Sequence, residues 1–579
     1  MATTNNLSSF IWSVADLLRG SYKQSDYGKV ILPFSVLRRL DCILEPTKDK
    51  VLKEFKKRTA EGIDPTPFLT RIAKQSFYNS SPLDLKKALA QPEQIKSNLL
   101  SYINGFSSNV GDIFEKYEFD VQLDKLADAD LLFLVAKKFS EIDLHPNQVS
   151  NADMGLIFEE LIRKFAELSN ETAGEHFTPR EVIRLMVDLL FLEDNEALSK
   201  PGVIRTLYDP TAGTGGMLSI AEEYLTGANG LNPDATLIVS GQELNPESYA
   251  ICKGDMLIKG QDVSNIKFGN TLKKDDHAGA KFDYVLSNPP FGEKWETSEE
   301  EVREEHKRLR FAGRFGPGLP RIDDGSLLFL LHSISKMREP EKGGGRIAIV
   351  FNGSPLFTGG AGSGESEIRK WVMEQDLLEA IIGLPTDMFY NTNISTYIWV
   401  LSNHKTKERK GKIQLINASD FFQKMRKTLG SKRKELGETD IDKIINLYGG
   451  FVTNEHSKIF EAKEFGYTTI TIERPLRDEA GKIIISNKGK TKGKPQADSS
   501  LRDTENVPLT EEVEEYFKRE VMPHAPDAWI NHEKTKVGYE IPFTRHFYVF
   551  KPPRTLSEID AELKQTTDKI LDMIRGLTA

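Results

Sequence analysis

The stretch from Val203 to Leu225, VIRTLYDPTAGTGGMLSIAEEYL, joins a β-branched run, a glycine-rich turn and a helical pattern in one continuous segment. The run Val203–Tyr208 predicts a strand, and the apolar spacing from Met217 to Leu225 predicts a helix. Glycine residues between a strand and a helix let the backbone approach a ligand closely at the helix N-terminus. The segment is therefore typical of an α/β protein that binds a ligand at a strand end.

The same alternation of short strands and helices continues over residues 166–410. The other candidate strands are Thr236–Gly241, Ile266–Gly269, Tyr284–Ser287, Arg346–Phe351, Leu378–Leu384 and Thr396–Leu401. Such alternation favours βα units, which build a mostly parallel sheet with helices on both faces. We therefore predict an α/β fold with one such sheet over this part of the chain.

The flanking regions carry other patterns. Residues 1–165 have helical spacing and predict an all-α domain that packs on the sheet domain, or that contacts DNA or another subunit. Residues 411–579 predict a partly helical region. In it, Phe421–Leu436 predicts a basic helix and residues 486–505 predict a flexible polar loop. Apolar residues at three- and four-residue steps predict a terminal helix over 555–577, which packs on its own chain or on a partner subunit.

Composition limits the classes of function. The chain has 579 residues, of which 39% are hydrophobic and 28% charged, and no stretch approaches the length of a membrane span. Only Cys42 and Cys252 occur, which argues against a disulfide framework or a cysteine zinc site and fits a reducing cytoplasm. The net charge of −9 weighs against a free-standing DNA-binding protein, so nucleic-acid contacts must come from local basic patches or from a partner.

Acidic residues accompany the glycine turn. Asp209 directly precedes it, and a carboxylate there would repel a phosphate but favour an amine, such as the ammonium of an amino-acid cofactor. Glu243 ends the next predicted strand, where an acid can accept both hydroxyl hydrogens of a ribose. Each acid alone is equally compatible with an exposed strand end, but together with Gly213, Gly215 and Gly216 they predict a cofactor site.

A helix start lies upstream at residues 175–181, Glu-His-Phe-Thr-Pro-Arg-Glu. Thr178 is placed to cap the helix, Pro179 suits its first position, and Glu181 completes a capping box. The pattern is consistent with a purely structural helix start. It is equally consistent with a helix whose N–H groups and dipole hold a carboxylate.

Residues 288–291 read Asn-Pro-Pro-Phe and follow the predicted strand Tyr284–Ser287. Two consecutive prolines fix the backbone and donate no N–H group. The Asn288 amide oxygen and the Pro289 carbonyl can then both accept hydrogens from one exocyclic amino group, and Phe291 can stack on a flat heterocycle. Two acceptors would draw that amine toward a tetrahedral geometry with an available lone pair. The structural alternative is a strand that ends in a proline-rich turn.

The basic stretch that follows contains Lys307, Arg308, Arg310, Arg314 and Arg321. We predict a mobile loop that closes on nucleic-acid phosphates. The alternative is a solvated charged loop.

Three motifs in this order carry a resemblance to a known family: residues 177–180 (FTPR), 209–216 (DPTAGTGG) and 288–291 (NPPF). They resemble the amino-methylating DNA methyltransferases, which use S-adenosylmethionine on a Rossmann-like sheet. More narrowly, the chain is similar to the modification subunit of type I restriction–modification enzymes, from near Leu7 to about Pro475. The loop at 486–505 matches no element of that family.

The resemblance implies a role for each residue of the motifs. The residues implied to bind the cofactor are Glu175, His176, Phe177, Thr178, Pro179, Arg180, Asp209, Gly213, Thr214, Gly215, Gly216 and Glu243. The residues implied to act on the target adenine are Asn288, Pro289, Pro290 and Phe291. The base would have to be flipped out of the duplex, because its amino group is paired there.

The implied function is methyl transfer from S-adenosylmethionine to adenine N6 in double-stranded DNA, without a metal. The implied partners are a specificity subunit and a restriction subunit with motor and nuclease activity, in a prokaryotic cytoplasm and away from any membrane. The alternatives are a stand-alone amino-methyltransferase acting on DNA, RNA or a protein glutamine, and a non-catalytic scaffold that binds S-adenosylmethionine.

Overall fold

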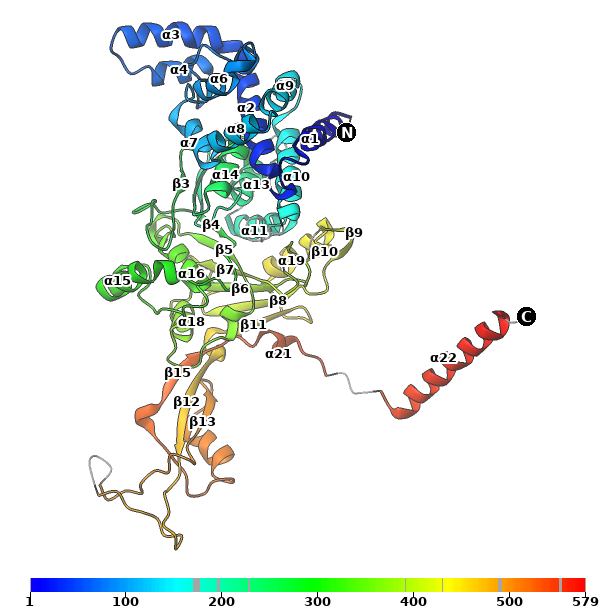
Figure 1. Cartoon of the computed structure of the whole chain (residues 1–579). Helices are drawn as coiled ribbons and strands as arrows, with labels where there is room; N and C mark the ends of the chain where they lie inside the picture. Colours follow the sequence, from blue (N-terminus) through cyan, green and yellow to red (C-terminus); the bar gives the residue numbers. More distant parts are fainter. Residues whose placement is uncertain are drawn as a thin grey trace. The chain divides into compact units, whose positions relative to one another are not determined.

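The computed structural model describes residues 2–169, 178–194, 198–227, 230–390, 392–429, 431–487, 492–550 and 554–577. Contacts divide the chain into two units, Met1–Ile541 and Pro542–Ala579. The first unit contains a nine-stranded sheet in the order β11-β8-β6-β7-β5-β4-β1-β2-β3 (Figure 1). The strands are β1 (Ile204–Asp209), β2 (Thr236–Glu243), β3 (Ile266–Phe268), β4 (Tyr284–Ser287), β5 (Arg346–Phe351), β6 (Leu378–Gly383), β7 (Tyr397–Ser402), β8 (Lys412–Asn417) and β11 (Ser457–Glu461).

Strands β3, β2, β1, β4 and β5 run parallel to one another, whereas β7 is antiparallel to both β5 and β6. The strand order reverses between β1 and β4, which pair through Leu207 with Tyr284 and Tyr208 with Val285. In doubly wound sheets such a reversal is the point where ligands bind, beyond the carboxyl ends of the strands. The predicted α/β fold is confirmed, and each of the seven predicted strands is present within one or two residues.

Helices cover both faces of this sheet. Helices α11 (Arg180–Phe191) and α13 (Gly216–Thr226) share a buried cluster with Ala348 and Val350 of β5. Helix α16 (Ser326–Ser335) packs on the same strand. Its buried leucines lie outside that cluster, because alternate residues of a strand point to opposite faces.

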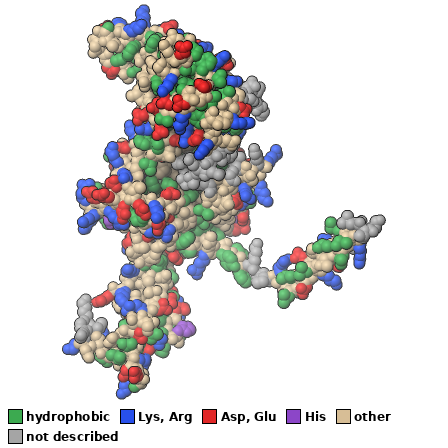
Figure 2. All heavy atoms as spheres, in the orientation of Figure 1, with side chains coloured by type: hydrophobic (Ala, Val, Ile, Leu, Met, Phe, Trp, Pro, Cys, Tyr) green, Lys and Arg blue, Asp and Glu red, His purple; other side chains and the backbone are tan. Residues whose placement is uncertain are grey.

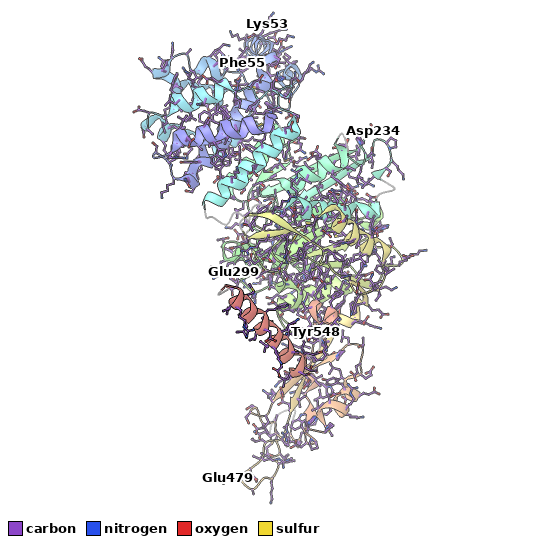
Figure 3. The ribbon with its side chains drawn as sticks, turned by 90° about the vertical axis from the view of Figure 1, so that its right-hand side faces the viewer. Lys53, Phe55, Asp234, Glu299, Glu479 and Tyr548 are labelled. Atoms are coloured by element: carbon purple, nitrogen blue, oxygen red, sulfur yellow. The ribbon has the colours of Figure 1, made fainter. Side chains whose placement is uncertain are left out.

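Residues 2–169 are helical, as predicted. The helices are α1 (Ala2–Leu18), α2 (Tyr27–Leu44), α3 (Lys48–Ala60), α4 (Thr66–Ala73), α5 (Leu85–Ala88), α6 (Ile95–Ile103), α7 (Ser108–Lys116), α8 (Phe119–Asp128), α9 (Leu132–Glu141) and α10 (Asn151–Ser169). Helices α2, α7 and α10 pack on α14 (Pro246–Ile258), which follows β2. Asp112 of α7 accepts hydrogen bonds of 2.8 Å from Tyr249 and Lys253 of α14. Lys53 and Phe55 of α3 lie at the end of the helical region away from the sheet (Figure 3).

The predicted basic helix over Phe421–Leu436 is wrong. This segment forms an antiparallel hairpin of β9 (Gln423–Leu429) and β10 (Lys432–Glu435), with Lys434 paired to Lys424. A helix needs an apolar stripe, but here half-buried Met425 stands between exposed Lys424 and Arg426, which is the period of a strand. Helix α19 (Glu438–Gly450) follows the hairpin and packs on α11.

The chain then builds a second, four-stranded sheet from β12 (Gly466–Glu473), β13 (Asp503–Pro508), β14 (Trp529–Ile530) and β15 (Lys536–Tyr539). The prediction of a loop over 486–505 is wrong at its end, because β13 begins at Asp503 and pairs with β12. Before that, bridges join Arg477 to Ile483 and Ile485 to Pro495. The cross-strand pairing supplies backbone partners that a local polar pattern does not reveal.

The second unit holds α21 (Phe543–Phe547) and the predicted terminal helix, α22 (Leu556–Leu577). Its apolar seam faces solvent: Leu556 is 79% exposed, Leu563 61% and Met573 71%. Among the described residues, no helix has both the length and the apolar character needed to cross a membrane.

Candidate functional site

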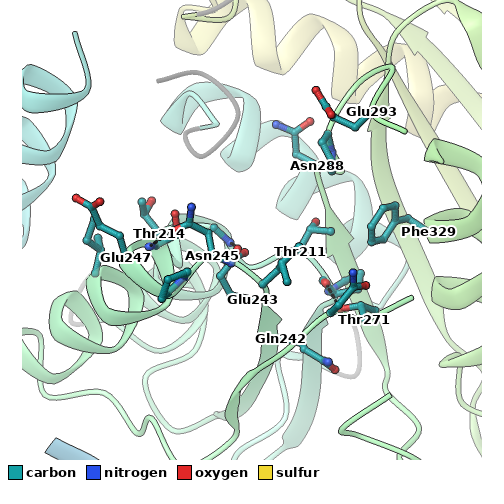
Figure 4. A pocket seen from close by; sticks show the side chains of 18 of the residues that line it. Thr211, Thr214, Gln242, Glu243, Asn245, Glu247, Thr271, Asn288, Glu293 and Phe329 are labelled. Atoms are coloured by element: carbon teal, nitrogen blue, oxygen red, sulfur yellow. Dashed lines mark hydrogen bonds between the residues drawn. The ribbon is translucent and has the colours of Figure 1, made fainter. Parts of the chain in front are cut away.

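The carboxyl ends of β1, β2 and β4 meet at one edge of the sheet, beside the point where the strand order reverses. A cavity of about 930 Å³ opens there. Gly213, Thr214 and Glu243 line one part of it, and Asn288 and Pro290 line another. Figure 4 shows Thr214 and Glu247 at one end and Asn288 with Glu293 at the other. The structure thus brings the glycine turn and the Asn-Pro-Pro-Phe segment to one site large enough for a small molecule and a base.

The glycine turn has a shape that other residues cannot easily adopt. Gly213 and Gly215 have positive φ angles of 54° and 81°. A Cβ atom on Gly215 would also lie 2.6 Å from the sulfur of Cys252. The next residue, Gly216, begins α13 and lines a smaller adjoining pocket together with Thr178, Asp209 and Asn288. The turn is therefore fixed by its neighbours before any ligand binds.

Asp209 lies under this turn and is only 1% exposed. Its carboxylate accepts hydrogen bonds from the backbone N–H (2.9 Å) and the hydroxyl (3.3 Å) of Thr211. Burial is the main cause that raises the pKa of Asp209 to about 7, and the charge of Glu243 adds to it. A cation placed beside this carboxylate would offset both effects.

Glu243 is also held firmly. Its Oε2 accepts the N–H of Gly213 at 2.8 Å, and its Oε1 accepts the N–H of Asn245 at 2.7 Å. A carboxylate oxygen can accept more than one hydrogen bond. The structure places Glu243 at the end of β2 in the cavity wall, where a sugar hydroxyl could reach it.

Asn288 combines one satisfied and one unsatisfied group. Its Nδ2 donates to the hydroxyl of Thr178 at 3.0 Å. Its Oδ1 is buried, and no described residue donates a hydrogen bond to it. A buried acceptor left without a donor costs about 1–3 kcal/mol, so native proteins rarely retain one without a function. The oxygen is therefore an unpaired acceptor on a residue that lines the cavity.

Phe291 does not line the cavity. Its ring packs against Phe389, with 6.4 Å between centroids and 72° between planes. The aromatic residues in the cavity wall are Phe165, Trp295, Phe329 and Tyr390, which were not singled out in the sequence. They come from separate elements, and no local spacing connects them with residues 288–291. Stacking of Phe291 on a base therefore stays a prediction.

The helix start at α11 differs from the predicted capping box. Pro179 is the N-cap and carries no side-chain cap, while the Thr178 hydroxyl is turned toward Asn288. Glu181 contacts Lys432 of the hairpin instead of the helix backbone. Arg180 reaches Glu223 of α13 at 3.4 Å. Tertiary partners thus replace the local cap, and Glu175, His176 and Phe177 lie outside the described residues.

The N-terminal helical region completes the cavity. Ser25 and Asp26 of the short turn η1 (Gln24–Asp26), Lys29 of α2, and Ile162 and Phe165 of α10 form part of its wall. The site is therefore built from two regions of the chain that were predicted as separate domains.

This geometry defines an α/β protein with a ligand turn after β1 and a polar acceptor after β4, the arrangement of a Rossmann-like methyltransferase. Residues 149–469 match the family model of the N-6 DNA methylases, and residues 7–139 match that of the HsdM N-terminal domain. The chain belongs to the N-6 DNA methylase family. The expected enzyme class, a DNA adenine methyltransferase, is confirmed by this membership.

Known proteins of similar length support the assignment. The methylase subunit of the type I restriction enzyme MjaIX from Methanocaldococcus jannaschii is 26% identical over 491 residues, with 81% of each chain covered. The MjaVII methylase subunit from the same organism is 29% identical, with 77% of this chain and 73% of that protein covered. The crystal structure of a type I restriction–modification methyltransferase subunit from Streptococcus thermophilus has a TM-score of 0.62 at 24% identity, and covers 80% of this chain and 97% of that one. The resemblance to type I modification subunits is confirmed.

Proposed function

We propose that this protein transfers a methyl group from S-adenosylmethionine to the N6 amine of an adenine flipped out of double-stranded DNA, as a type I modification subunit. The observation that carries the proposal is the buried Oδ1 of Asn288, which has no donor among the described residues and lies on the same cavity as the glycine turn. An exocyclic amine is a donor that fits this acceptor.

The residues around the glycine turn fit S-adenosylmethionine. Asp209 offers a buried carboxylate toward a positively charged group, and Glu243 is a carboxylate in the cavity wall that ribose hydroxyls could reach. Gly213, Thr214, Gly215 and Gly216 would leave room for the cofactor to lie close to the backbone. When bound, the cofactor supplies an electrophilic methyl group.

At the target, the chain positions the amine. Asn288 Oδ1 and the Pro289 carbonyl would each accept one amine hydrogen, which frees the nitrogen lone pair to face the methyl group. Thr178, which accepts a hydrogen bond from Asn288 Nδ2, would hold the amide in place. Asn288 cannot take a proton, so the proton released from the amine passes to solvent after transfer. Catalysis then rests mainly on proximity and orientation.

The three regions of the chain would have different roles in this reaction. Residues 1–165 would close the cavity over the catalytic region 166–410, and residues 411–579 would mediate assembly. The exposed apolar seam of α22 suits a helix of a specificity subunit, because packing would bury Leu556, Leu563 and Met573. A restriction subunit with motor and nuclease activity would join the same assembly. The proposed reaction would take place in the cytoplasm of a prokaryotic cell, in keeping with the organisms of the relatives.

The test is a methyl-transfer assay on the full chain, alone and together with a specificity subunit identified among the chains that co-purify with it. Labelled methyl groups should appear as N6-methyladenine in DNA, as read by nucleoside mass spectrometry, and only when the second subunit is present. Methylation at cytosine N4, or of RNA or protein, would contradict the proposed substrate. Site-specific methylation by the chain alone would contradict the subunit assignment.

A further inference from the structure

The hairpin β9–β10 carries an unusual charge. Residues 421–435 contain six Lys or Arg residues and one acidic residue, Glu435, although the whole chain has a net charge of −9. Lys424, Arg426 and Arg433 are exposed, and the structure gives their side chains no ion pair with any described residue. Figure 2 shows Lys and Arg side chains gathered over this part of the surface. We call these three residues the hairpin cations.

The pairing within the hairpin places like charges against each other. Lys424 stands directly across from Lys434 in the antiparallel register. Like charges at such positions destabilise a strand pair. Lys434 is drawn away by Asp387 at 3.8 Å and by the ring of Phe422 at 4.2 Å, while Lys424 receives no compensation among the described residues. An external anion would relieve the repulsion.

The hairpin is attached to the edge of the cavity. The backbone N–H of Ser431 donates to the carbonyl of Tyr390, and that of Arg433 donates to Asp387, both at 2.9 Å. Buried Lys432 contacts Glu181 at the start of α11 and donates to the carbonyl of Met388 at 3.1 Å. Tyr390 lines the cavity, and its neighbour Phe389 packs on Phe291. The hairpin therefore follows the 387–390 loop at the carboxyl edge of the sheet.

The basic stretch that the sequence suggested for phosphate contact is less suited to it. Arg314 is 12% exposed, pairs with Glu305 at 2.7 Å, and donates to the carbonyls of Thr271 and Leu272. Its prediction as a phosphate contact is wrong. Lys307 and Arg308 are exposed, but they lie in the last turn of a helix, α15 (Glu299–Leu309), that carries five glutamates: Glu299, Glu300, Glu301, Glu304 and Glu305. Their positive charge is therefore opposed locally, unlike that of the hairpin.

We propose that the hairpin cations bind the DNA backbone beside the flipped nucleotide. The inference rests on the proposed function. A nucleotide that enters the cavity keeps its flanking phosphates at the mouth, next to the 387–390 loop. Cations at this position neutralise phosphates without reading sequence, and they set the register of the duplex on the enzyme.

The test compares two triple variants of the full chain in complex with its specificity subunit. The first is Lys424→Gln with Arg426→Gln and Arg433→Gln. The control is Lys342→Gln with Lys407→Gln and Lys410→Gln, three exposed cations beside the amino end of β5, at the opposite edge of the sheet. Lys432 is left unchanged, because it is buried against Glu181.

In a DNA duplex with one target adenine, the hairpin variant should raise the KM for DNA about tenfold or more at physiological salt, with kcat and cofactor affinity retained. The slope of log affinity against log salt should fall by about 2 to 3, one for each lost phosphate contact. The control variant should retain the parental values. The single variant Arg433→Gln should reduce the slope by about one, which keeps the test valid if the triple variant folds poorly.

An unchanged KM and salt slope in the hairpin variant would overturn the inference while leaving the proposed function intact. Loss of the specificity subunit on purification, with unchanged DNA affinity in what remains, would also overturn it and assign the surface to that subunit. A parent complex that methylates no DNA at any salt concentration would instead refute the proposed function.

Discussion

The carboxyl ends of β1 and β4, between which the strand order reverses, differ in how their polar groups are satisfied. At the end of β1, Asp209 and the glycine turn are held by internal hydrogen bonds, and Glu243 receives two backbone N–H groups. At the end of β4, the Asn288 oxygen lies buried without a donor among the described residues. The first end is complete as part of the fold, whereas the second needs a ligand. Changes at the first should therefore damage stability and cofactor binding, and changes at the second should damage chemistry alone.

The largest effect on activity is expected at the end of β4, where Asn288 lies. Asn288→Ala should lower kcat about a hundredfold or more, because removal of one positioned polar group in an active site has an effect of that order. Cofactor affinity and melting temperature should stay near the parental values, since the only internal side-chain hydrogen bond lost among the described residues is that from Nδ2 to Thr178. Radiolabelled methyl transfer, calorimetric binding and thermal denaturation provide the three readouts. A variant with normal kcat would refute the role of Asn288.

A large effect on stability is expected in the glycine turn after β1. Gly215→Ala should lower the free energy of unfolding by about 1–3 kcal/mol, since it forces alanine into a positive φ angle and against Cys252. It should also abolish cofactor binding.

Gly216→Ala is the matched control for stability. Its Cβ would meet only Ile183 at 3.6 Å, an ordinary contact, so urea unfolding should show little change. Equal destabilisation by the two variants would mean that the turn is not constrained as described.

Asp209, at the end of β1, should make the stability of the fold depend on pH. Because burial raises its pKa to about 7, above its ordinary value of 3.8, the folded protein binds more protons than the unfolded chain between these values. Its contribution to stability is full below about pH 4 and is lost as the pH rises through about 7. One pKa unit corresponds to about 1.4 kcal/mol.

Asp209→Asn removes this titration, so its melting temperature relative to the parent should rise between about pH 5 and pH 8. Its cofactor affinity at about pH 8 should fall, because the carboxylate is lost. A stability difference that does not change with pH would contradict the assignment of the shift to Asp209.

The smallest effect concerns Thr178, which only positions Asn288. Thr178→Val should reduce kcat/KM for DNA by about two- to tenfold, the equivalent of one hydrogen bond. Thr178→Ser retains the hydroxyl and should restore the parental rate. A serine variant as impaired as the valine variant would indicate that packing, rather than the hydrogen bond to Asn288, is what Thr178 provides.

Much of the fold could be predicted because its signals are local. The strand, glycine turn and helix of residues 203–225 follow one another directly, and β4 leads into Asn288 without interruption. The hairpin at 423–435 could not be predicted in this way, since its strands depend on cross-strand pairing and on attachment to the 387–390 loop. The one local sign against a helix was a dense run of Lys and Arg residues without an apolar stripe.

The site was predictable to a similar extent. Asp209, Glu243 and Asn288 each end a strand, so parallel topology alone brings them together. The contact of Thr178 with Asn288, the packing of Phe291 on Phe389 and the place of Phe329 in the cavity depend on how distant elements dock. These contacts could not be predicted from local sequence patterns.

The claim that the free oxygen of Asn288 receives the target amine can be measured by a double-mutant cycle between protein and DNA. Four affinities are needed: the parent and Asn288→Ala complexes, each with a duplex that carries adenine or unsubstituted purine at the target position. Purine lacks the exocyclic amine, and the difference in base pairing cancels in the cycle. We expect a coupling of about 1 kcal/mol or more between Asn288 and the amine. A coupling indistinguishable from zero would contradict that claim.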